Sequence, residues 1–239
     1  MEEFIRGPLV WIAFAVFFAG LLLQGWLFFR NTSPRQRRRL AVPEPKKKKP
    51  QKDKKTPLTP AALYAWLVNG SSACYQRHWP RLRRTVLFTH PFMTVVTVVF
   101  HTFLFAAPLL ARAHNELLRR GLGAGLPSLA DAAVDAMTLV VLLCGAIFLW
   151  RRLLVRRVRA ITTFYDYLVL AITLAPFVTG FMAAHHWLDY HTVILVHIGC
   201  GELMLMAIPF TKLGHMIYFF LYRFLLPGEY SFGQGSRAW

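Results

Sequence analysis

The sequence predicts an all-α fold, an integral membrane bundle of five transmembrane helices. The 239 residues are 56% hydrophobic yet carry a formal net charge of +17, so apolar and basic residues must be segregated along the chain. Five apolar stretches reach the roughly 20 residues that a helix needs to cross the hydrocarbon core of a bilayer. These stretches lack the alternating pattern of an outer-membrane barrel. Membrane-spanning helices are therefore expected rather than strands.

We expect the five helices near residues 8–29, 85–110, 131–150, 161–184 and 192–222. The chain begins MEEFIRG, which lacks the basic start of a signal peptide, and a full-length apolar span and arginines follow. The first helix is therefore expected to be retained. The predicted organisation is a first transmembrane helix over 1–30, a basic loop over 31–84, a four-helix transmembrane domain over 85–226 and a tail over 227–239.

The orientation follows from the positions of the cations. Residues 30–84 contain sixteen of the 28 lysines and arginines. The connection between the third and fourth helices adds five more: Arg151, Arg152, Arg156, Arg157 and Arg159. Cation-rich loops lie preferentially on the cytoplasmic side of a membrane. We therefore expect a periplasmic N-terminus and a cytoplasmic C-terminus in a bacterial inner membrane.

The first loop contains the segment AVPEPKKKKPQKDKKTPLTP, whose prolines and lysines allow neither a core nor a stable helix. We expect a solvated linker whose lysines are attracted to anionic membrane lipids, with docking to an acidic cytoplasmic partner as an alternative. Aromatic side chains are not interleaved with the lysines, so nucleic-acid binding is not expected. The next segment, LTPAALYAWLVNGSSACYQRHW, is predicted to form a short helix at the membrane surface.

The cysteines exclude several kinds of cofactor site. Cys74, Cys144 and Cys200 are scattered, and no C-x-x-C pair occurs in the sequence. The chain therefore supplies neither an iron–sulfur cluster of its own nor a c-type haem attachment site. The sequence also lacks a phosphate-binding glycine loop, an H-E-x-x-H zinc motif and a nucleophile elbow. Any cofactor must be held by other residues.

Histidines supply the candidate ligands. His90 and His101, eleven residues apart in HPFMTVVTVVFH, lie about 20° apart around a helix, and His197 and His215, eighteen residues apart, return to about the same direction. Each pair therefore shares one helix face. Ionisable groups inside a membrane are costly and usually functional, and neutral imidazole is a common ligand of haem iron. These four residues are candidate axial ligands of two b-type haems held between helices.

The predicted topology sets the pairing. The second and fifth helices must run antiparallel, so we expect His90 to pair with His215 near the cytoplasmic side and His101 to pair with His197 toward the outer side. The two spacings differ in rise along straight helices, about 16 Å against about 27 Å. Pro209 is expected to kink the fifth helix and reduce this difference. Met204 or Met206 is a less favoured alternative ligand to His215.

This arrangement resembles the γ subunit of respiratory nitrate reductase and its relatives, the membrane cytochromes b of heterodisulfide reductase and of sulfate-reducer transmembrane redox complexes. These proteins are similar in having five helices, an outer N-terminus and haem-ligating histidines on helices 2 and 5, which correspond to His90, His101, His197 and His215. The lysine-rich first loop favours the complexes that contain high-molecular-mass or type II cytochrome c.

The resemblance implies an electron-transfer subunit of an oxidoreductase complex. Such a subunit takes electrons from the quinone pool or from a periplasmic multihaem cytochrome c and passes them to a cytoplasmic iron–sulfur subunit beside the inner haem. Two b-type haems are the implied cofactors, and menaquinone is a further candidate. The chain has no soluble redox domain, so other membrane and soluble subunits are the expected partners.

Other polar residues are weaker candidates. Arg84 and Lys212 are candidate contacts of the inner haem propionates, with anchoring at the membrane surface as the alternative. Arg112, with His114 and Arg120, is a candidate contact of the outer propionates or a quinone, with solvation at the interface as the alternative. Glu202 inside the fifth helix is expected to be protonated or hydrogen-bonded, and a role in a proton path is a further hypothesis for it. The outer-loop histidines are interpreted mainly as interface residues: His185, His186 and His191.

Two other functions remain open from the sequence. Intramembrane histidines also serve proton or metal-ion transporters, although five spans show no internal duplication of the kind found in many transporters. A haem-free anchor that recruits soluble redox subunits through its basic cytoplasmic face is the other alternative. Haem absorbance distinguishes these classes.

Overall fold

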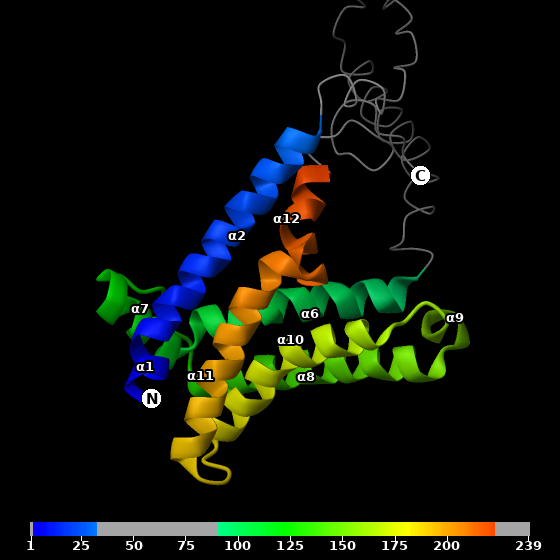
Figure 1. Cartoon of the computed structure of the whole chain (residues 1–239). Coiled ribbons are helices and arrows are strands. Elements are labelled where there is room, and N and C mark those ends of the chain that lie inside the picture. The colour runs from blue at the N-terminus through cyan, green and yellow to red at the C-terminus, as the bar shows by residue number, and fades with distance from the viewer. Residues whose placement is uncertain (1, 33–89, 223–239) are drawn as a thin grey trace, which may run out of the picture. The chain divides into compact units, whose positions relative to one another are not determined.

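The computed structural model describes residues 2–32 and 90–222, and these residues are helical with no strand among them (Figure 1). Five helices are long and apolar enough to cross a membrane: Glu2–Asn31, Pro91–Leu110, Asp131–Leu154, Phe164–Ala184 and Tyr190–Phe210. This confirms the predicted all-α fold with five spans and makes the chain a multi-pass membrane protein. The predicted basic linker, interfacial helix and tail lie outside the described residues, and so does Arg84.

The described chain divides into two compact units. The larger unit contains residues 2–24 and 95–215, and the smaller contains 25–32, 90–94 and 216–222. In the smaller unit Phe28 and Tyr222 meet edge to face, with ring centroids 5.3 Å apart. His90, which precedes the second span, is exposed and belongs to this unit.

The first span consists of α1 (Glu2–Phe4), the π-helical turn η1 (Ile5–Leu9) and α2 (Val10–Asn31). The second span is α6 (Pro91–Leu110), which is followed by the short helix α7 (Arg112–Leu122). The third is α8 (Asp131–Leu154), and the four-residue α9 (Arg156–Arg159) leads to the fourth, α10 (Phe164–Ala184). Thr163 and Asp166 form a capping box that starts α10.

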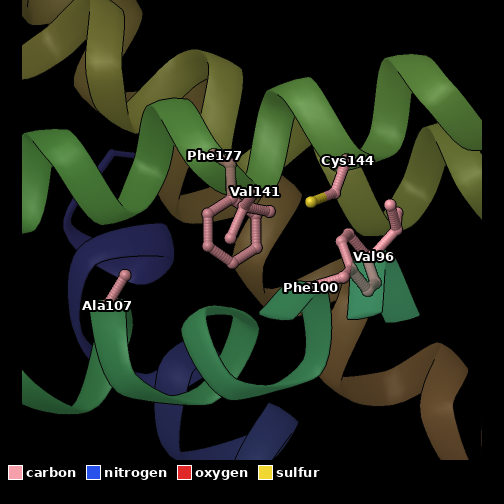
Figure 2. Packing of buried hydrophobic residues seen from close by; sticks show 6 residues of the cluster. All are labelled: Val96, Phe100, Ala107, Val141, Cys144 and Phe177. Carbon is pink, nitrogen blue, oxygen red and sulfur yellow. The ribbon is translucent and has the colours of Figure 1, made fainter. Parts of the chain in front are cut away.

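Apolar side chains of α6, α8 and α10 form the core of the larger unit (Figure 2). Phe100 of α6 meets Phe148 of α8 edge to face at 5.0 Å between ring centroids. On α8, a Cβ at Gly145 would lie 2.6 Å from the methyl carbons of Leu174, so glycine there lets α10 approach closely. The buried members of the core are Val96, Phe100, Ala107, Val141, Cys144 and Phe177.

The fifth span is α11 (Tyr190–Ala207) with the 3₁₀ turn η2 (Ile208–Phe210). The prediction of one helix over 192–222 is wrong beyond this point, because Thr211 is extended (φ −119°, ψ −174°). A second turn, η3 (Lys212–Gly214), and α12 (His215–Phe220) follow. Pro209, where a kink was expected, lies in η2, and its carbonyl accepts a hydrogen bond from Nε2 of Gln24 at 2.7 Å.

A second helix break separates α6 from α7 at Ala111, which has an extended backbone (φ −67°, ψ 131°). Such a break leaves the last carbonyls of a helix without their usual partners. Here side chains bind two of them: Nδ1 of His114 donates to Pro108 at 2.8 Å, and Nδ2 of Asn115 donates to Leu109 at 3.0 Å. The break is thus stabilised by the same residues that it places at the start of α7.

Candidate functional site

Two histidine pairs lie in the larger unit. His101 of α6 and His215 at the start of α12 have ring centroids 5.9 Å apart and planes at 89°. His114 of α7 and His197 of α11 also have ring centroids 5.9 Å apart, with planes at 5°. In both pairs, one histidine comes from the α6–α7 segment and the other from the α11–α12 segment.

The four imidazoles share one hydrogen-bonding pattern. Each Nδ1 lies within hydrogen-bond distance of a backbone carbonyl: Thr97 at 2.7 Å from His101, Pro108 at 2.8 Å from His114, Pro176 at 3.0 Å from His197 and Lys212 at 2.9 Å from His215. A carbonyl oxygen can only accept a hydrogen bond, so each Nδ1 is the donor, and in the neutral form of the ring Nε2 is then the nitrogen without a proton. Among residues 2–32 and 90–222, no side chain or backbone group makes a hydrogen bond to these four Nε2 atoms.

This pattern is the one that metal-ligating histidines use. Their second ring nitrogen donates to a carbonyl or carboxylate, which fixes the tautomer and the direction of the ring. Metal–imidazole nitrogen bonds are about 2 Å long, so two rings on opposite sides of one metal have centres about 6 Å apart. The spacing of 5.9 Å in both pairs agrees with this value. In ring spacing and in the role of Nδ1, both pairs resemble two histidines that bind one metal atom.

His185 and His191, near the α10–α11 connection, are bound differently. Nε2 of His191 contacts Glu2 at 2.8 Å, and Nε2 of His185 lies 3.3 Å from Asp135. Their Nε2 atoms already have carboxylate partners, unlike those of the two pairs. Across the described ranges no group of three or more His, Cys, Asp or Glu residues is arranged to hold a bare metal ion. His185 and His191 thus have acidic partners within the chain, and their interpretation as interface residues stays a prediction.

Glycine makes room for the ring of His197. A Cβ built on Gly180 of α10 would lie 2.8 Å from Cε1 and 3.1 Å from Nδ1 of His197. No side chain fits there without displacing the ring. The Nδ1–H of His197 is shared between the carbonyl of Pro176 and Oγ1 of Thr179, 3.3 Å away. α10 thus determines both the position and the tautomer of His197.

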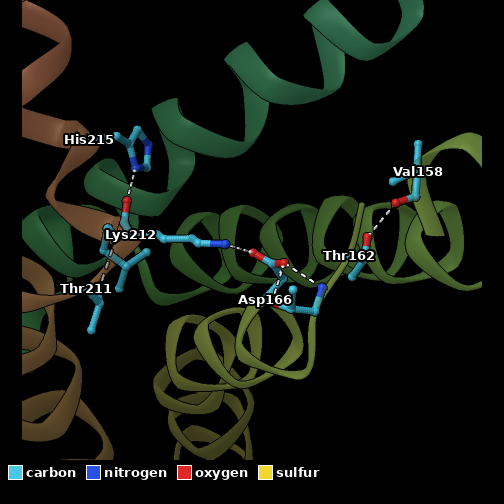
Figure 3. A network of polar contacts seen from close by, with 8 residues as sticks. Val158, Thr162, Asp166, Thr211, Lys212 and His215 are labelled. Carbon is cyan, nitrogen blue, oxygen red and sulfur yellow. Dashed lines mark hydrogen bonds and ion pairs between the residues drawn. The ribbon is translucent and has the colours of Figure 1, made fainter. Parts of the chain in front are cut away.

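His215 is positioned through Lys212 (Figure 3). Nζ of Lys212 binds Oδ1 of Asp166 at 2.7 Å, and the carbonyl of Lys212 accepts the Nδ1–H of His215. Asp166 is itself fixed by the backbone N–H of Thr163 at 2.8 Å. The start of α10 therefore fixes the turn that orients His215. Lys212, a predicted propionate contact, has a carboxylate partner within the chain.

The predicted site residues are only partly brought together. His101, His197 and His215 all take part in ring pairs, but the rings that meet are not those of the predicted pairing. His101 meets His215 instead of His197, and His197 meets His114. The predicted partner of His215 was His90 and the observed one is His101. The predicted partner of His197 was His101 and the observed one is His114. Arg112, the other predicted outer contact, forms an exposed ion pair with Asp131 at 3.7 Å.

The sequence separations of the histidines within each segment match better for the observed pairs than for the predicted pairs. His101 and His114 are thirteen residues apart and His197 and His215 eighteen, which along unbroken helices would be rises of about 20 Å and about 27 Å. This difference is smaller than that for the predicted pairs. The breaks at Ala111 and Thr211 interrupt both segments between their histidines.

Comparison with known proteins gives one full-length relative. The chain is 33% identical over 238 residues to a protein of Nitratidesulfovibrio vulgaris (strain Hildenborough), and the match covers 100% of this chain and 97% of the other. The two chains belong to one family. No family model matches the sequence, and no solved structure matches it. The similarity therefore extends over the whole length of the chain.

Sequence reasoning missed the pairing of His114 with His197. On one continuous helix, thirteen residues turn His114 about 140° away from His101, so periodicity assigns the two to different faces. The helix break at Ala111 removes that constraint. Gly180 and Asn115 were missed as well, because their roles depend on contacts with segments that are distant in the sequence. The sequence signal for His114 was its place beside a proline-containing helix end, six residues after Pro108.

Proposed function

We propose that the chain is a di-haem cytochrome b subunit of a respiratory complex. The observation that carries the proposal is the presence of two imidazole pairs, each at 5.9 Å between ring centroids and each with both Nδ1 atoms bonded to carbonyls. His101 and His215 would hold one b-type haem, and His114 and His197 the other. His90, assigned as a ligand from the sequence alone, has no ligand role in this proposal.

The residues of the chain supply positions and ligand orientation, and bound haem would supply one-electron redox chemistry. The four carbonyl-bonded Nδ1 atoms keep each imidazole in the tautomer that offers Nε2. The carbonyls of Pro176 and Pro108 serve His197 and His114, and those of Thr97 and Lys212 serve the other pair. Imidazoles oriented in this way need little rearrangement to bind iron, which favours tight haem binding.

The two pairs are assigned to opposite sides of the membrane. Lys212, three residues before His215, binds Asp166 in the first turn of α10. The arginine-rich α9 lies just before this turn in the sequence. By the positive-inside rule, that end of the bundle is cytoplasmic. The His101–His215 pair then forms the inner site and the His114–His197 pair the outer site. The same rule gives a periplasmic N-terminus and a cytoplasmic C-terminus in a bacterial inner membrane.

The electron path follows from this assignment. Electrons from the quinone pool, such as menaquinol, or from a periplasmic multihaem cytochrome c would enter at the outer site. They would leave from the inner site to a cytoplasmic iron–sulfur subunit. The chain contains no C-x-x-C pair for a cluster of its own, so the soluble redox centres must belong to partner subunits. The resemblance to nitrate reductase γ-type cytochromes b supports the same division of labour.

The test is a haem count on the purified protein by pyridine haemochrome analysis and reduced-minus-oxidised spectra. The wild type should contain two b haems per chain. His101→Ala, His215→Ala and the double variant should each retain the same one haem, because both residues serve one site. His114→Ala and His197→Ala should retain the other haem, and His101→Ala with His197→Ala should retain none.

His90→Ala is the matched control, since it removes a membrane-segment histidine that lies in neither ring pair. It should keep two haems per chain. A wild type without haem would exclude the proposal and return these histidines to proton, metal-ion or packing roles. Loss of one haem in His90→Ala would favour the pairing expected from the sequence over the ring pairs.

A further inference from the structure

A buried carboxylic acid in α11 has no role in the proposed haem sites. Glu202 is 4% exposed, and its Oε1 has no hydrogen-bond partner among residues 2–32 and 90–222. It lies in the fifth span, eight residues from Phe210 at its end. An ionised carboxylate without a partner is very costly to bury in an apolar medium, so such a group takes up a proton.

The register of α2 and α11 places Glu202 at a helix–helix contact. A Cβ on Gly20 would lie 2.5 Å from the ring of Pro209, so the two helices touch closely at that level. Since η1 packs against α11 and Gly20 against Pro209, the two helices run parallel. Seven residues earlier on each helix stand Ala13, which is 0% exposed, and Glu202. Seven residues are nearly two turns, so each of these residues shares a face with its counterpart.

The described segments that pack against the middle of α11 supply no cation to neutralise a carboxylate there. α2 from Val10 to Gln24 and α10 from Leu168 to Ala184 contain no titratable side chain, and η2 contains none. The nearest titratable residues on α11 itself are Cys200 and His197, and the ring of His197 faces His114. Arg6 of η1 is bound to Glu2 at 3.0 Å. With no cation to balance its charge, the carboxyl group of Glu202 is expected to bind a proton.

We propose that Glu202 is a proton-binding site within the membrane, with a neutral carboxyl group at neutral pH that exchanges its proton with water. Seven residues beyond Glu202, the carbonyl of Pro209 accepts a hydrogen bond from Nε2 of Gln24 at 2.7 Å, so the first span also supplies a polar side chain to this segment. This site goes beyond the electron-transfer proposal and does not depend on haem.

The experiment is infrared spectroscopy of the full-length protein in lipid, which separates the carbonyl stretch of a protonated carboxyl from carboxylate bands. The wild type should show a protonated-carboxyl band at neutral pH that shifts in D₂O and disappears at high pH. Glu202→Gln, which keeps the shape of the side chain, should lose this band. Glu116→Gln is the matched control, because Glu116 is exposed and bound to Arg120 at 2.8 Å, and it should keep the band.

A second measurement needs no variant. An apolar carbodiimide reacts with protonated carboxyl groups inside membranes, so mass spectrometry of the treated wild type should find the adduct at Glu202. The proposal is overturned if the protonated-carboxyl band is unchanged in Glu202→Gln, or if the band neither shifts in D₂O nor responds to pH. Haem content is read separately, so a failure of this proposal is distinguishable from a failure of the haem sites.

Discussion

The side chain of Asn115 accepts a hydrogen bond from the backbone N–H of Leu126 at 3.0 Å. Its amide nitrogen donates to the carbonyl of Leu109 at 3.0 Å and to Oγ of Ser128 at 3.2 Å. Asn115 is 1% exposed, so these bonds are made away from solvent. They connect the end of α6, the start of α7 and the loop before α8. They therefore fix the backbone that carries the adjacent His114.

Replacing Asn115 with alanine should destabilise the protein and weaken the proposed haem site at His114 and His197. The change removes all three hydrogen bonds of this buried side chain, to Leu126, Leu109 and Ser128, which costs about 2–3 kcal/mol of unfolding free energy at about 1 kcal/mol for each bond. Chemical denaturation should show the loss, and the haem count should fall toward one per chain. Ser128→Ala is the control, since it removes one bond of three and should have a smaller effect. Wild-type stability in Asn115→Ala would contradict this role.

Gly180 should be required for haem binding at His197. The additional side chain of Gly180→Val would overlap the ring, because even a Cβ would lie 2.8 Å from Cε1. We expect about half of the haem to be lost, with the His101–His215 site retained. Gly199→Val is the matched control on α11, because a Cβ at Gly199 has no atom within 4 Å. Two haems in Gly180→Val would show that the ring of His197 does not occupy this position.

The N-cap of α11 should make stability depend on pH through Asp189. Its carboxylate accepts bonds from Oγ1 of Thr192 at 2.7 Å and from the backbone N–H of Thr192 at 2.8 Å. These bonds, the side-chain bond first, lower the pKa of Asp189 below its usual value, and the charge of His191 contributes to the same direction. A lowered folded-state pKa gives stability that is fully present above the unfolded pKa and is lost as the pH falls through the folded pKa.

The measurement is the difference in denaturation midpoint between wild type and Asp189→Ala as a function of pH. The wild type should be more stable by a constant amount above about pH 5, and the difference should shrink below the ordinary aspartate pKa of about 3.9. Thr192→Val removes the side-chain hydrogen bond, which is the largest cause of the lowered pKa of Asp189, and keeps the bond from the backbone N–H. The loss of stability relative to wild type should therefore be smaller in Thr192→Val than in Asp189→Ala. A difference that grows on acidification would contradict the assigned sign.

The five spans were predictable because length and apolarity alone set them. The antiparallel relation of the two ligand segments also follows from counting crossings, and in both ring pairs the later histidine of one segment meets the earlier of the other. The start of α10 at Phe164 has a visible signal in the sequence, the Thr163–Asp166 capping box. Composition and local sequence signals were therefore sufficient to predict the five spans and the start of α10.

The ligand register was not predictable in the same way. Ala111 is a good helix former, and the residue at that position does not predict an extended backbone. The break is stabilised by distant partners, such as the backbone N–H of Leu129 on the carbonyl of Leu110 at 3.0 Å. Helical periodicity applies only within one unbroken helix, so it paired His101 with His197 and did not bring the rings of His114 and His197 together. Tertiary hydrogen bonds decided which rings meet.

The different ring angles of the two pairs make a spectroscopic prediction. The planes of His101 and His215 are at 89°, whereas those of His114 and His197 are at 5°. Perpendicular axial imidazoles interact equally with two iron d orbitals and leave them nearly degenerate, whereas parallel imidazoles separate their energies. Low-spin ferric haem with near-degenerate orbitals has a more anisotropic electron paramagnetic resonance signal. The oxidised protein should therefore show two distinct low-spin signals.

Single variants assign the two signals. His215→Ala should remove the strongly anisotropic signal and keep the more rhombic one, and His197→Ala should do the reverse. His90→Ala should keep both. If one signal represented both haems, the two pairs would have the same ring angle and the described geometry would be wrong for one of them. If the assignments were exchanged, both haems would be present but the ring angles would be reversed, because each variant removes a ligand from only one site.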